Sequence, residues 1–143
     1  MINSTDFDFS FSGLKTAALY LVKKLTPRQI KMLTPAICAE FQQAVIDVLV
    51  SKTIRAARKF GAKIVMLSGG VAANELLRDT LKLETEKLKI TKNGPEFLVP
   101  PKNLCTDNAA MVAFAAYLKT QNKKNINRGA WRTLKARANL RIA

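Results

Sequence analysis

Histidine is absent from this 143-residue sequence, and cysteine occurs only as Cys38 and Cys105. Without histidine the chain has no internal Ser–His–Asp triad. It also cannot build, by itself, a zinc site of the usual histidine and cysteine kind. The two cysteines are far apart in the sequence and form no C-x-x-C pair, so we expect free thiols.

The sequence has no apolar run that approaches the roughly 20 residues of a membrane span. Its first residues, MINSTDFDFSFSG, are polar and acidic, which is unlike the charged and then apolar pattern of a signal peptide. We therefore expect a cytoplasmic protein. The hydrophobic content of 48% and the mean hydropathy near zero are typical of a globular chain, and the length suits one ordinary domain.

Acidic residues are scarce, since 10 Asp and Glu stand against 24 Lys and Arg, and the net charge is +14. Such an excess favours a polyanionic partner, because basic side chains neutralise phosphates and release counterions. No acid occurs from Lys119 to the end of the chain. The candidate contacts with nucleic acid in this stretch are Lys123, Lys124, Arg128 and Arg132. A solvated basic tail is the alternative interpretation.

Apolar periodicity and turn residues divide the chain into alternating strands and helices. The expected elements are a strand at 7–11, a helix at 14–25, a helix from Thr34–Pro35 to Gly61, a strand at 63–67, a helix at 74–88, a strand at 94–101 and a helix capped by Thr106 or Asp107. This order predicts an α/β fold with a mixed, partly parallel sheet flanked by helices. We expect the α/β lobe at 1–122 and a basic C-terminal tail at 123–143.

Side-chain spacing gives two further expectations. Phe7, Phe9 and Phe11 alternate with polar residues, as in a half-buried strand, and we expect them in the core rather than exposed for base stacking. In the long helix, Lys52 and Arg55 are expected on the polar side. The apolar face of that helix is expected to carry Ile37, Phe41, Val45, Val48 and Leu49.

Three junctions between elements carry residues suited to ligand binding, and in open α/β sheets ligands collect where strands end and helices begin. The junctions are FSFSGLKT (9–16), SGGVAAN (68–74) and CTDNAAM (105–111). Gly69 and Gly70 allow positive φ and close approach to a phosphate, while helix amides attract anions. A plain turn is the alternative, because the spacing matches neither a dinucleotide fingerprint nor a P-loop.

Two other residues at these junctions are equally open to two interpretations. Asp107 either caps the following helix or ligates a metal ion, and one oxygen ligand cannot hold a metal alone. Lys15 is either solvated or directed toward the site.

The segments DFDFSFSGLKTA, SGGVAANELLR and PPKNLCTDNAAMVA, in this order, closely resemble the C-terminal half of the tRNA threonylcarbamoyladenosine transferases. Bacterial members of that family were once described as O-sialoglycoprotein endopeptidases. The resemblance covers nearly the whole chain, and the C-terminal end more loosely. It implies one lobe of the actin-like ATPase and sugar-kinase (ASKHA) fold, with the active site between two related α/β lobes.

The resemblance also implies an activity, which is transfer of the threonylcarbamoyl group from threonylcarbamoyl-AMP to N6 of adenosine 37 in tRNAs that read codons starting with A. It implies one divalent metal, iron or zinc, and a nucleotide ligand, threonylcarbamoyl-AMP or ATP. By position, Asn74 matches the family's substrate-binding asparagine, and Gly69 and Gly70 match the glycine turn beside the nucleotide. Asp107 matches the aspartate that ligates the metal.

The sequence departs from the family pattern in one important respect. The family's other metal ligands are histidines of an H-x-x-x-H motif in the N-terminal half, and this chain has no histidine and no counterpart of that half. Met1 corresponds to an interior position of the family, so we expect a piece of the enzyme that neither binds metal tightly nor catalyses transfer alone. The expected partners are tRNA, the missing N-terminal lobe, a paralogous subunit and an ATPase.

Two other functions remain open from the sequence. The chain could be a non-catalytic lobe that binds RNA or another subunit, and its apolar face could mediate self-association. A lobe of a related sugar kinase or ATPase fits the CTDNAAM segment less well.

Overall fold

The computed structural model describes residues 2–89 and 94–121, together with Arg132 and Lys135. The chain divides into two compact units, Met1–Thr106 and Asp107–Ala143, and each is described here by itself. Most of the predicted basic tail at 123–143 lies outside the described residues, so its boundary at 122 stays a prediction.

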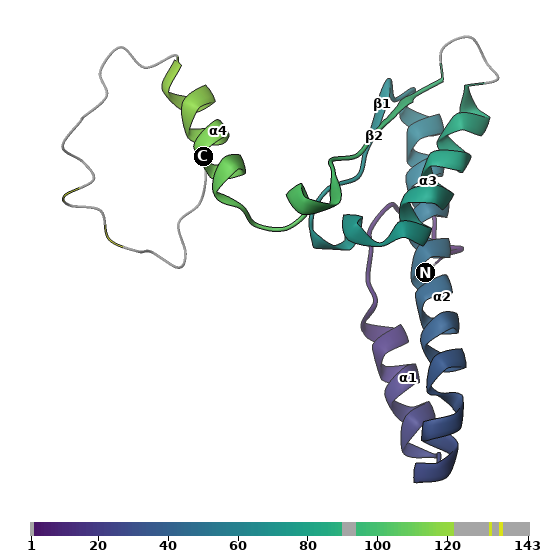
Figure 1. The fold of residues 1–143 in the computed structure, drawn as a ribbon. Coiled ribbons are helices and arrows are strands. Elements are labelled where there is room, and N and C mark those ends of the chain that lie inside the picture. The colour runs from purple at the N-terminus through teal and green to yellow at the C-terminus, as the bar shows by residue number, and fades with distance from the viewer. Residues whose placement is uncertain (1, 90–93, 122–131, 133–134, 136–143) are drawn as a thin grey trace. The chain divides into compact units, whose positions relative to one another are not determined.

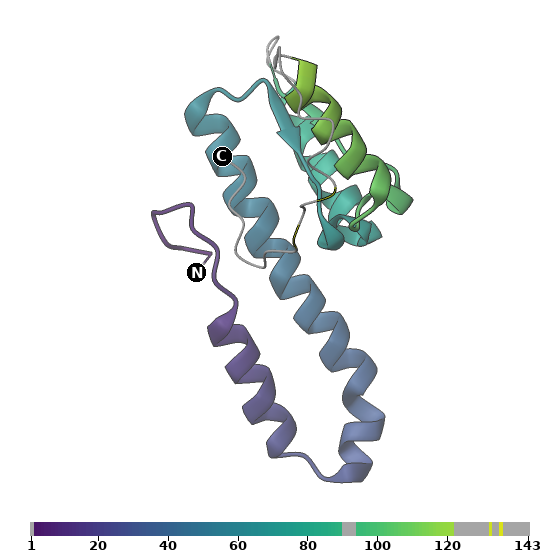
Figure 2. The same cartoon turned by 90° about the vertical axis from the view of Figure 1, so that its left-hand side faces the viewer.

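Two helices form the N-terminal part of the first unit. Helix α1 spans Ser12–Lys23, and helix α2 spans Pro27–Phe60. Both views show α1 alongside the N-terminal half of α2 (Figures 1 and 2). The prediction of a helix at 14–25 is confirmed. Helix α2 ends where the sequence predicts, because Gly61 adopts the left-handed conformation (φ 59°) that closes a helix.

Helix α2 begins earlier than the sequence analysis expects. Thr26 and Gln29 form a capping box, in which the Thr26 Oγ1 accepts from the Gln29 amide at 3.3 Å and the Gln29 Oε1 accepts from the Thr26 amide at 2.9 Å. Pro27 occupies the first helical turn, where its missing N–H costs nothing. The predicted start at Thr34–Pro35 is therefore wrong, and Pro35 lies inside the helix.

The rest of the first unit is a strand–helix–strand arrangement. Strand β1 (Ile64–Met66) leads through the short helix η1 (Gly70–Ala73) into helix α3 (Glu75–Leu88), and strand β2 (Glu96–Leu98) follows. The strands pair in parallel with Val65 opposite Phe97. A mixed α/β structure is thus confirmed, with a two-stranded parallel sheet among the described residues.

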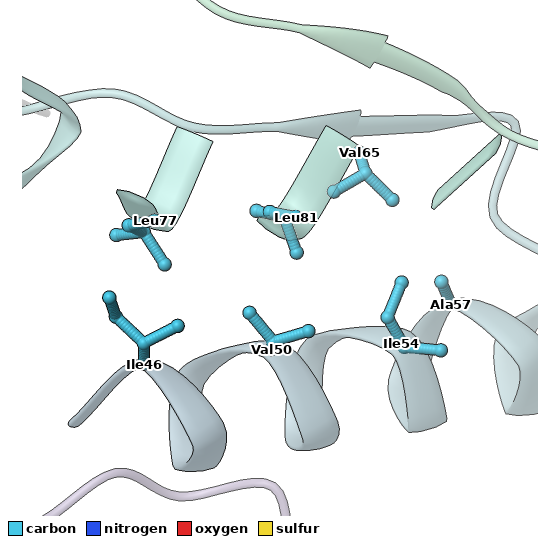
Figure 3. Packing of buried hydrophobic residues seen from close by; sticks show 7 residues of the cluster. All are labelled: Ile46, Val50, Ile54, Ala57, Val65, Leu77 and Leu81. Carbon is cyan, nitrogen blue, oxygen red and sulfur yellow. The ribbon is translucent and has the colours of Figure 1, made fainter. Parts of the chain in front are cut away.

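The core lies between α2, α3 and β1 (Figure 3). Its buried side chains are Ile46, Val50, Ile54 and Ala57 of α2, Leu77 and Leu81 of α3, and Val65 of β1. The predicted apolar face of α2 is only partly correct, since its members are half-buried or, like Phe41, 37% exposed. Because α2 carries apolar residues on several sides, its packing partners decide which stripe is buried.

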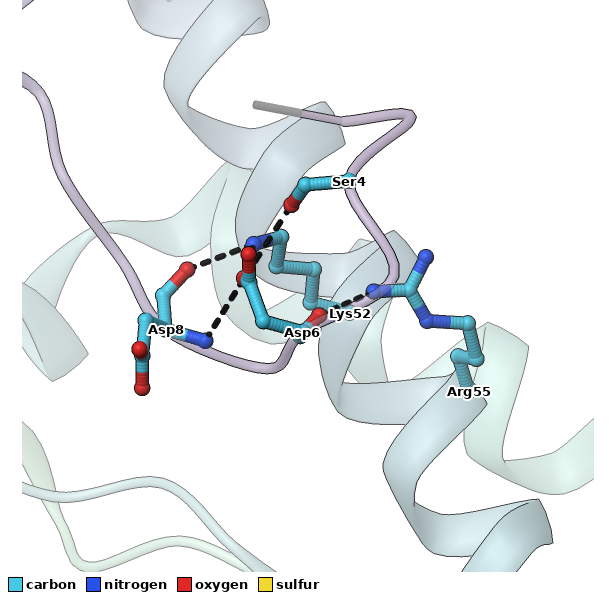
Figure 4. Close-up of polar contacts among 5 residues, drawn as sticks. All are labelled: Ser4, Asp6, Asp8, Lys52 and Arg55. Atoms are coloured by element: carbon cyan, nitrogen blue, oxygen red, sulfur yellow. Dashed lines mark hydrogen bonds and ion pairs between the residues drawn. The ribbon is translucent and has the colours of Figure 1, made fainter.

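The prediction that Lys52 lies on the polar side of α2 is wrong, because its side chain is fully buried. Figure 4 shows its polar contacts with the N-terminal segment. Its ammonium donates to the Asp6 Oδ1 at 2.7 Å and to the Asp8 carbonyl at 2.5 Å. Arg55 donates to the Asp6 carbonyl. A buried lysine requires such partners, and residues far away in the sequence supply them.

The N-terminal segment that contacts Lys52 includes residues 7–11, which the sequence predicts as a strand. Residues 7–11 form neither a helix nor a strand, so that prediction is wrong. A strand needs a neighbour to pair with, and β1 pairs with β2 in the described part of the chain. Phe7 packs against Phe60 with ring centroids 5.5 Å apart, whereas Phe9 is 48% exposed.

Acid should release this N-terminal segment. The hydrogen bond from Lys52, followed by that from Ser4, lowers the pKa of the Asp6 carboxyl from its ordinary 3.8. A lowered folded-state pKa means that the contact stabilises fully above pH 3.8 and is lost as the pH falls below it. The carboxyl carbon of Asp6, followed by NMR, should therefore titrate with its midpoint below 3.8. Asp6→Asn should remove that titration, and a midpoint at or above 3.8 would contradict the pairing.

The second unit contains helix α4 (Ala109–Gln121). The Met111 amide donates to the Asn108 Oδ1 at 2.9 Å, so Asn108 caps the helix. The predicted cap at Thr106 or Asp107 is therefore wrong by one or two positions. No residue of α4 is buried, although the helix is rich in apolar side chains.

Length and composition alone would allow α2 to cross a membrane, which differs from the expectation of no such run. The same criterion also selects the core helices of globular proteins. The buried Lys52 and four core side chains lie in the C-terminal half of α2, whereas only 11% of its most apolar 18-residue window is buried, and one such helix is weak evidence for a membrane span.

Candidate functional site

The glycine turn, defined as residues 68–74, follows β1 directly. Gly69 has φ 85° and ψ 177°, a backbone conformation that is essentially restricted to glycine. The turn is closed by hydrogen bonds of 3.0 Å from the Ala72 amide to the Gly69 carbonyl and from the Asn74 amide to the Val71 carbonyl. The conformation therefore explains why Gly69 is glycine, and the turn passes at once into α3.

The glycine turn faces open space. A Cβ added at Gly69 or Gly70 would meet no atom within 4 Å, and both residues are exposed. The amides of Gly69, Gly70 and Val71 donate no hydrogen bond to another residue that the structure describes. Free backbone amides at the start of a helix are suited to binding an anion such as a phosphate.

Asn74 ends the turn and fixes it to two helices. Its Oδ1 accepts from the Leu77 amide at 3.0 Å, which makes Asn74 the N-cap of α3. Its Nδ2 donates to the Gln42 Oε1 of α2 at 3.1 Å. A carboxamide has two N–H donors and an oxygen with two lone pairs, so Asn74 retains one donor and one acceptor position for a ligand.

A hollow of about 250 Å³ adjoins the turn. Val71 and Asn74 line it from the turn, and Phe41 and Gln42 line it from α2. Its lining is largely apolar, with the carboxamides of Gln42 and Asn74 as the polar groups. Ligand sites typically combine an apolar wall with a few placed polar groups. No sequence pattern singles out Gln42, because its contact with Asn74 spans 32 positions.

The loop after β2, which contains the short helix η2 (Lys102–Leu104), lies close to the first turn of α3. Lys102 pairs with Glu75, and this pairing lowers the pKa of the Glu75 carboxyl from its ordinary value. Arg78 donates to the carbonyls of Ala72 and Pro100 and to the sulfur of Cys105. Arg78 therefore connects the glycine turn to Cys105, which is the first residue of the CTDNAAM segment. Both cysteines are free, as predicted.

Asp107 is the first residue of the second unit, and its side chain is exposed. Its carboxylate makes no hydrogen bond or ion pair with another described residue, and Asn108 caps the helix in its place. No cluster of three or more His, Cys, Asp or Glu side chains that could hold a metal occurs within 2–89 and 94–121. Asp107 can thus supply one oxygen ligand, and the described residues do not complete a metal site.

In the part of the chain that the structure describes, the FSFSGLKT junction makes no hydrogen bond or ion pair with the glycine turn. Ser10 and Ser12 share a hydrogen bond of 3.1 Å, and Thr16 donates to the Ser12 carbonyl at 3.0 Å. Lys15 is exposed. Lys123, Lys124 and Arg128 lie outside the described residues, and Arg132 is described as exposed.

Comparison with known proteins identifies the family to which the chain is similar. Residues 1–114 match the family model described as TsaD, tRNA N6-adenosine threonylcarbamoyltransferase. Proteins of that name are 50% identical over 121 residues in Desulfotalea psychrophila, 46% over 127 residues in Thermosipho melanesiensis and 42% over 142 residues in Thermosipho africanus. These alignments cover 82%, 89% and 99% of this chain.

The same alignments cover 34%, 36% and 40% of the three relatives, so the chain spans little more than a third of their length. The matched region includes both the glycine turn and Asp107. The chain belongs to the tRNA N6-adenosine threonylcarbamoyltransferase family.

Proposed function

We propose that this chain supplies part of the active site of a tRNA-modifying transferase. The reaction moves a threonylcarbamoyl group from threonylcarbamoyl-AMP to N6 of adenosine 37 in tRNAs that read codons starting with A. The observation that carries the proposal is the family match over residues 1–114, a region with an exposed glycine turn whose amides donate to no residue that the structure describes. The fold we propose for the complete enzyme is a pair of actin-like ATPase (ASKHA) lobes, with this chain forming one of them.

In this proposal the glycine turn holds the nucleotide. The amides of Gly69, Gly70 and Val71 donate to the phosphate of the adenylate, or of ATP where ATP occupies the site. The free donor of Asn74 orients the acyl group beside it. N6 of adenosine attacks the carbamoyl carbonyl carbon, the bond from that carbon to the phosphate oxygen breaks, N6 loses a proton and AMP leaves.

Asp107 is proposed as one ligand of a divalent metal, iron or zinc. Its exposed carboxylate suits this role, whereas the described residues lack the further ligands. A metal bound there would act as a Lewis acid toward the acyl phosphate. The rest of the ligand set must come from outside the described residues, and the histidine-bearing part of the enzyme is the proposed source.

The proposed partners are tRNA, that N-terminal lobe, the paralogous subunit and the ATPase of the modification system, in the cytoplasm. Large apolar side chains are exposed on two helices, which supports the proposal that a partner protein covers them. On α1, Leu19 and Tyr20 are 52% and 59% exposed, and on α4, Val112 and Phe114 are 71% and 62% exposed. Large exposed apolar side chains favour an interaction site on each of these helices, and without the partner they favour self-association.

Reconstitution tests the proposed function. The chain is mixed with the N-terminal part of a full-length relative, threonylcarbamoyl-AMP, metal and tRNA, and modified adenosine is measured by mass spectrometry. We expect transfer in the mixture and none with either part alone. A mixture that binds tRNA but forms no product, beside an active full-length control, would instead support a non-catalytic RNA-binding or partner-binding lobe. The net charge of +14 supports tRNA binding in both functions.

The basic tail should contribute to tRNA affinity in either case. Changing Lys123, Lys124, Arg128 and Arg132 to glutamine removes four positive charges. We expect weaker tRNA binding and a smaller slope of log K against log salt, by about 0.7 to 0.9 for each phosphate that the variant no longer neutralises. Fluorescence anisotropy at several salt concentrations measures both quantities. An unchanged affinity and slope would show that the tail is only solvated.

A further inference from the structure

Arg78 joins two segments that leave the same end of the sheet. The glycine turn follows β1, and residues 99–105 follow β2, its parallel partner. Ligands of open parallel sheets bind at this end. We propose that Arg78 is a positioning residue that fastens the glycine turn to the loop at 100–105, and the proposal rests on the proposed function of the turn.

The contacts of Arg78 reach both segments. Its Nη2 donates to the Pro100 carbonyl at 2.7 Å and to the Cys105 Sγ at 2.9 Å, and its Nε donates to the Ala72 carbonyl. Ala72 is fully buried and Cys105 is 3% exposed. Hydrogen bonds from a charged donor are strong, and shielding from water strengthens them further.

Arginine is the side chain that suits this position. The guanidinium is planar and carries five donors in a fixed fork, so a single group can bind acceptors on separate segments. Among the described side chains, the pair Glu75–Lys102 also links α3 to the loop, and these side chains are 72% and 53% exposed. Exposed pairs contribute little. Arg78 is therefore the stronger of the two ties.

The loop that Arg78 holds leads to the proposed metal ligand. Cys105 precedes Asp107 by two residues in the sequence, and its thiol donates to the Pro101 carbonyl at 3.4 Å. Arg78 itself contacts backbone carbonyls and a sulfur, and none of the proposed substrate-binding atoms. Its removal should therefore misalign the glycine turn rather than remove a binding contact.

The reactivity of the buried Cys105 thiol measures whether Arg78 holds the loop at 100–105, and it can be measured in this chain without its partners. In a Cys38→Ser background, which leaves one cysteine, Arg78→Met should raise the rate of maleimide labelling at Cys105 by about tenfold or more. Lys82→Met removes an exposed charge from the same helix and should leave the rate unchanged. A wild-type labelling rate in folded Arg78→Met would overturn the proposal. If circular dichroism shows that this variant has unfolded, Arg78→Gln decides by the same criterion.

Kinetics in the reconstituted enzyme separate positioning from binding. For Arg78→Met we expect kcat to fall by roughly tenfold while KM for threonylcarbamoyl-AMP changes less than about twofold. A raised KM with unchanged kcat would overturn the positioning role. If even the wild-type mixture forms no product, the proposed function fails, and the labelling rates still decide whether Arg78 holds the loop.

Discussion

Truncation of Leu77 to alanine is expected to destabilise the chain by about 2–5 kcal/mol, the range for a leucine cut back in a packed core. Leu77 is 2% exposed and belongs to the cluster between α3 and α2. It also lines the hollow beside Asn74, so removal of its side chain would enlarge an existing space. The free energy of unfolding is measured by urea denaturation of the whole chain.

Leu83→Ala provides the matched control on the same helix. Leu83 is 54% exposed, so the same change there removes little buried surface and should alter stability by less than about 0.5 kcal/mol. Helix propensity cancels between the two variants because the residue change is identical. Equal losses of stability at Leu77 and Leu83 would contradict the assignment of the core.

The correct predictions of the fold rest on local signals. Gly61 ends α2 because a left-handed residue closes a helix, and that requirement is visible in the sequence. The β-branched run at 63–67 and the amphipathic stretch at 74–88 likewise predict β1 and α3 from side-chain periodicity. Each of these elements needs only its own residues to be recognised.

The wrong predictions depend on contacts between distant residues. Lys52 is buried because Asp6 and Asp8 accept hydrogen bonds from its ammonium, at sequence separations of 46 and 44. The alternation at 7–11 meets the local requirement for a strand, but pairing also requires a neighbouring strand. A sequence pattern carries no information about such a partner.

The candidate site divides in the same way. The conformation of Gly69 could be anticipated from glycine's tolerance of positive φ, and Asn74 from its position before a helix. Gln42 and Arg78 could not, since their partners are 32 positions away for Gln42 and up to 27 for Arg78. The residues that support a site are therefore harder to find than those that form its surface.

Asp107→Ala is expected to reduce transfer by the reconstituted enzyme by about 100-fold or more. Changes to the residues that only support metal ligands already cost about 10–100-fold in affinity or activity, and loss of a direct ligand should cost at least as much. The bound iron or zinc is counted by mass spectrometry of the purified complex, alongside the rate of adenosine modification. We expect both the metal content and the rate to fall.

The neighbouring cap supplies the control that separates a ligand from a structural residue. Asn108 caps α4, so Asn108→Ala should cost about 1 kcal/mol of stability while the metal content stays at the wild-type level. Asp107→Ala should show the opposite, with stability near wild type because its carboxylate has no partner among the described residues. Retention of metal together with a loss of stability in Asp107→Ala would contradict the proposed ligand role, because it would make Asp107 a structural residue like its neighbour.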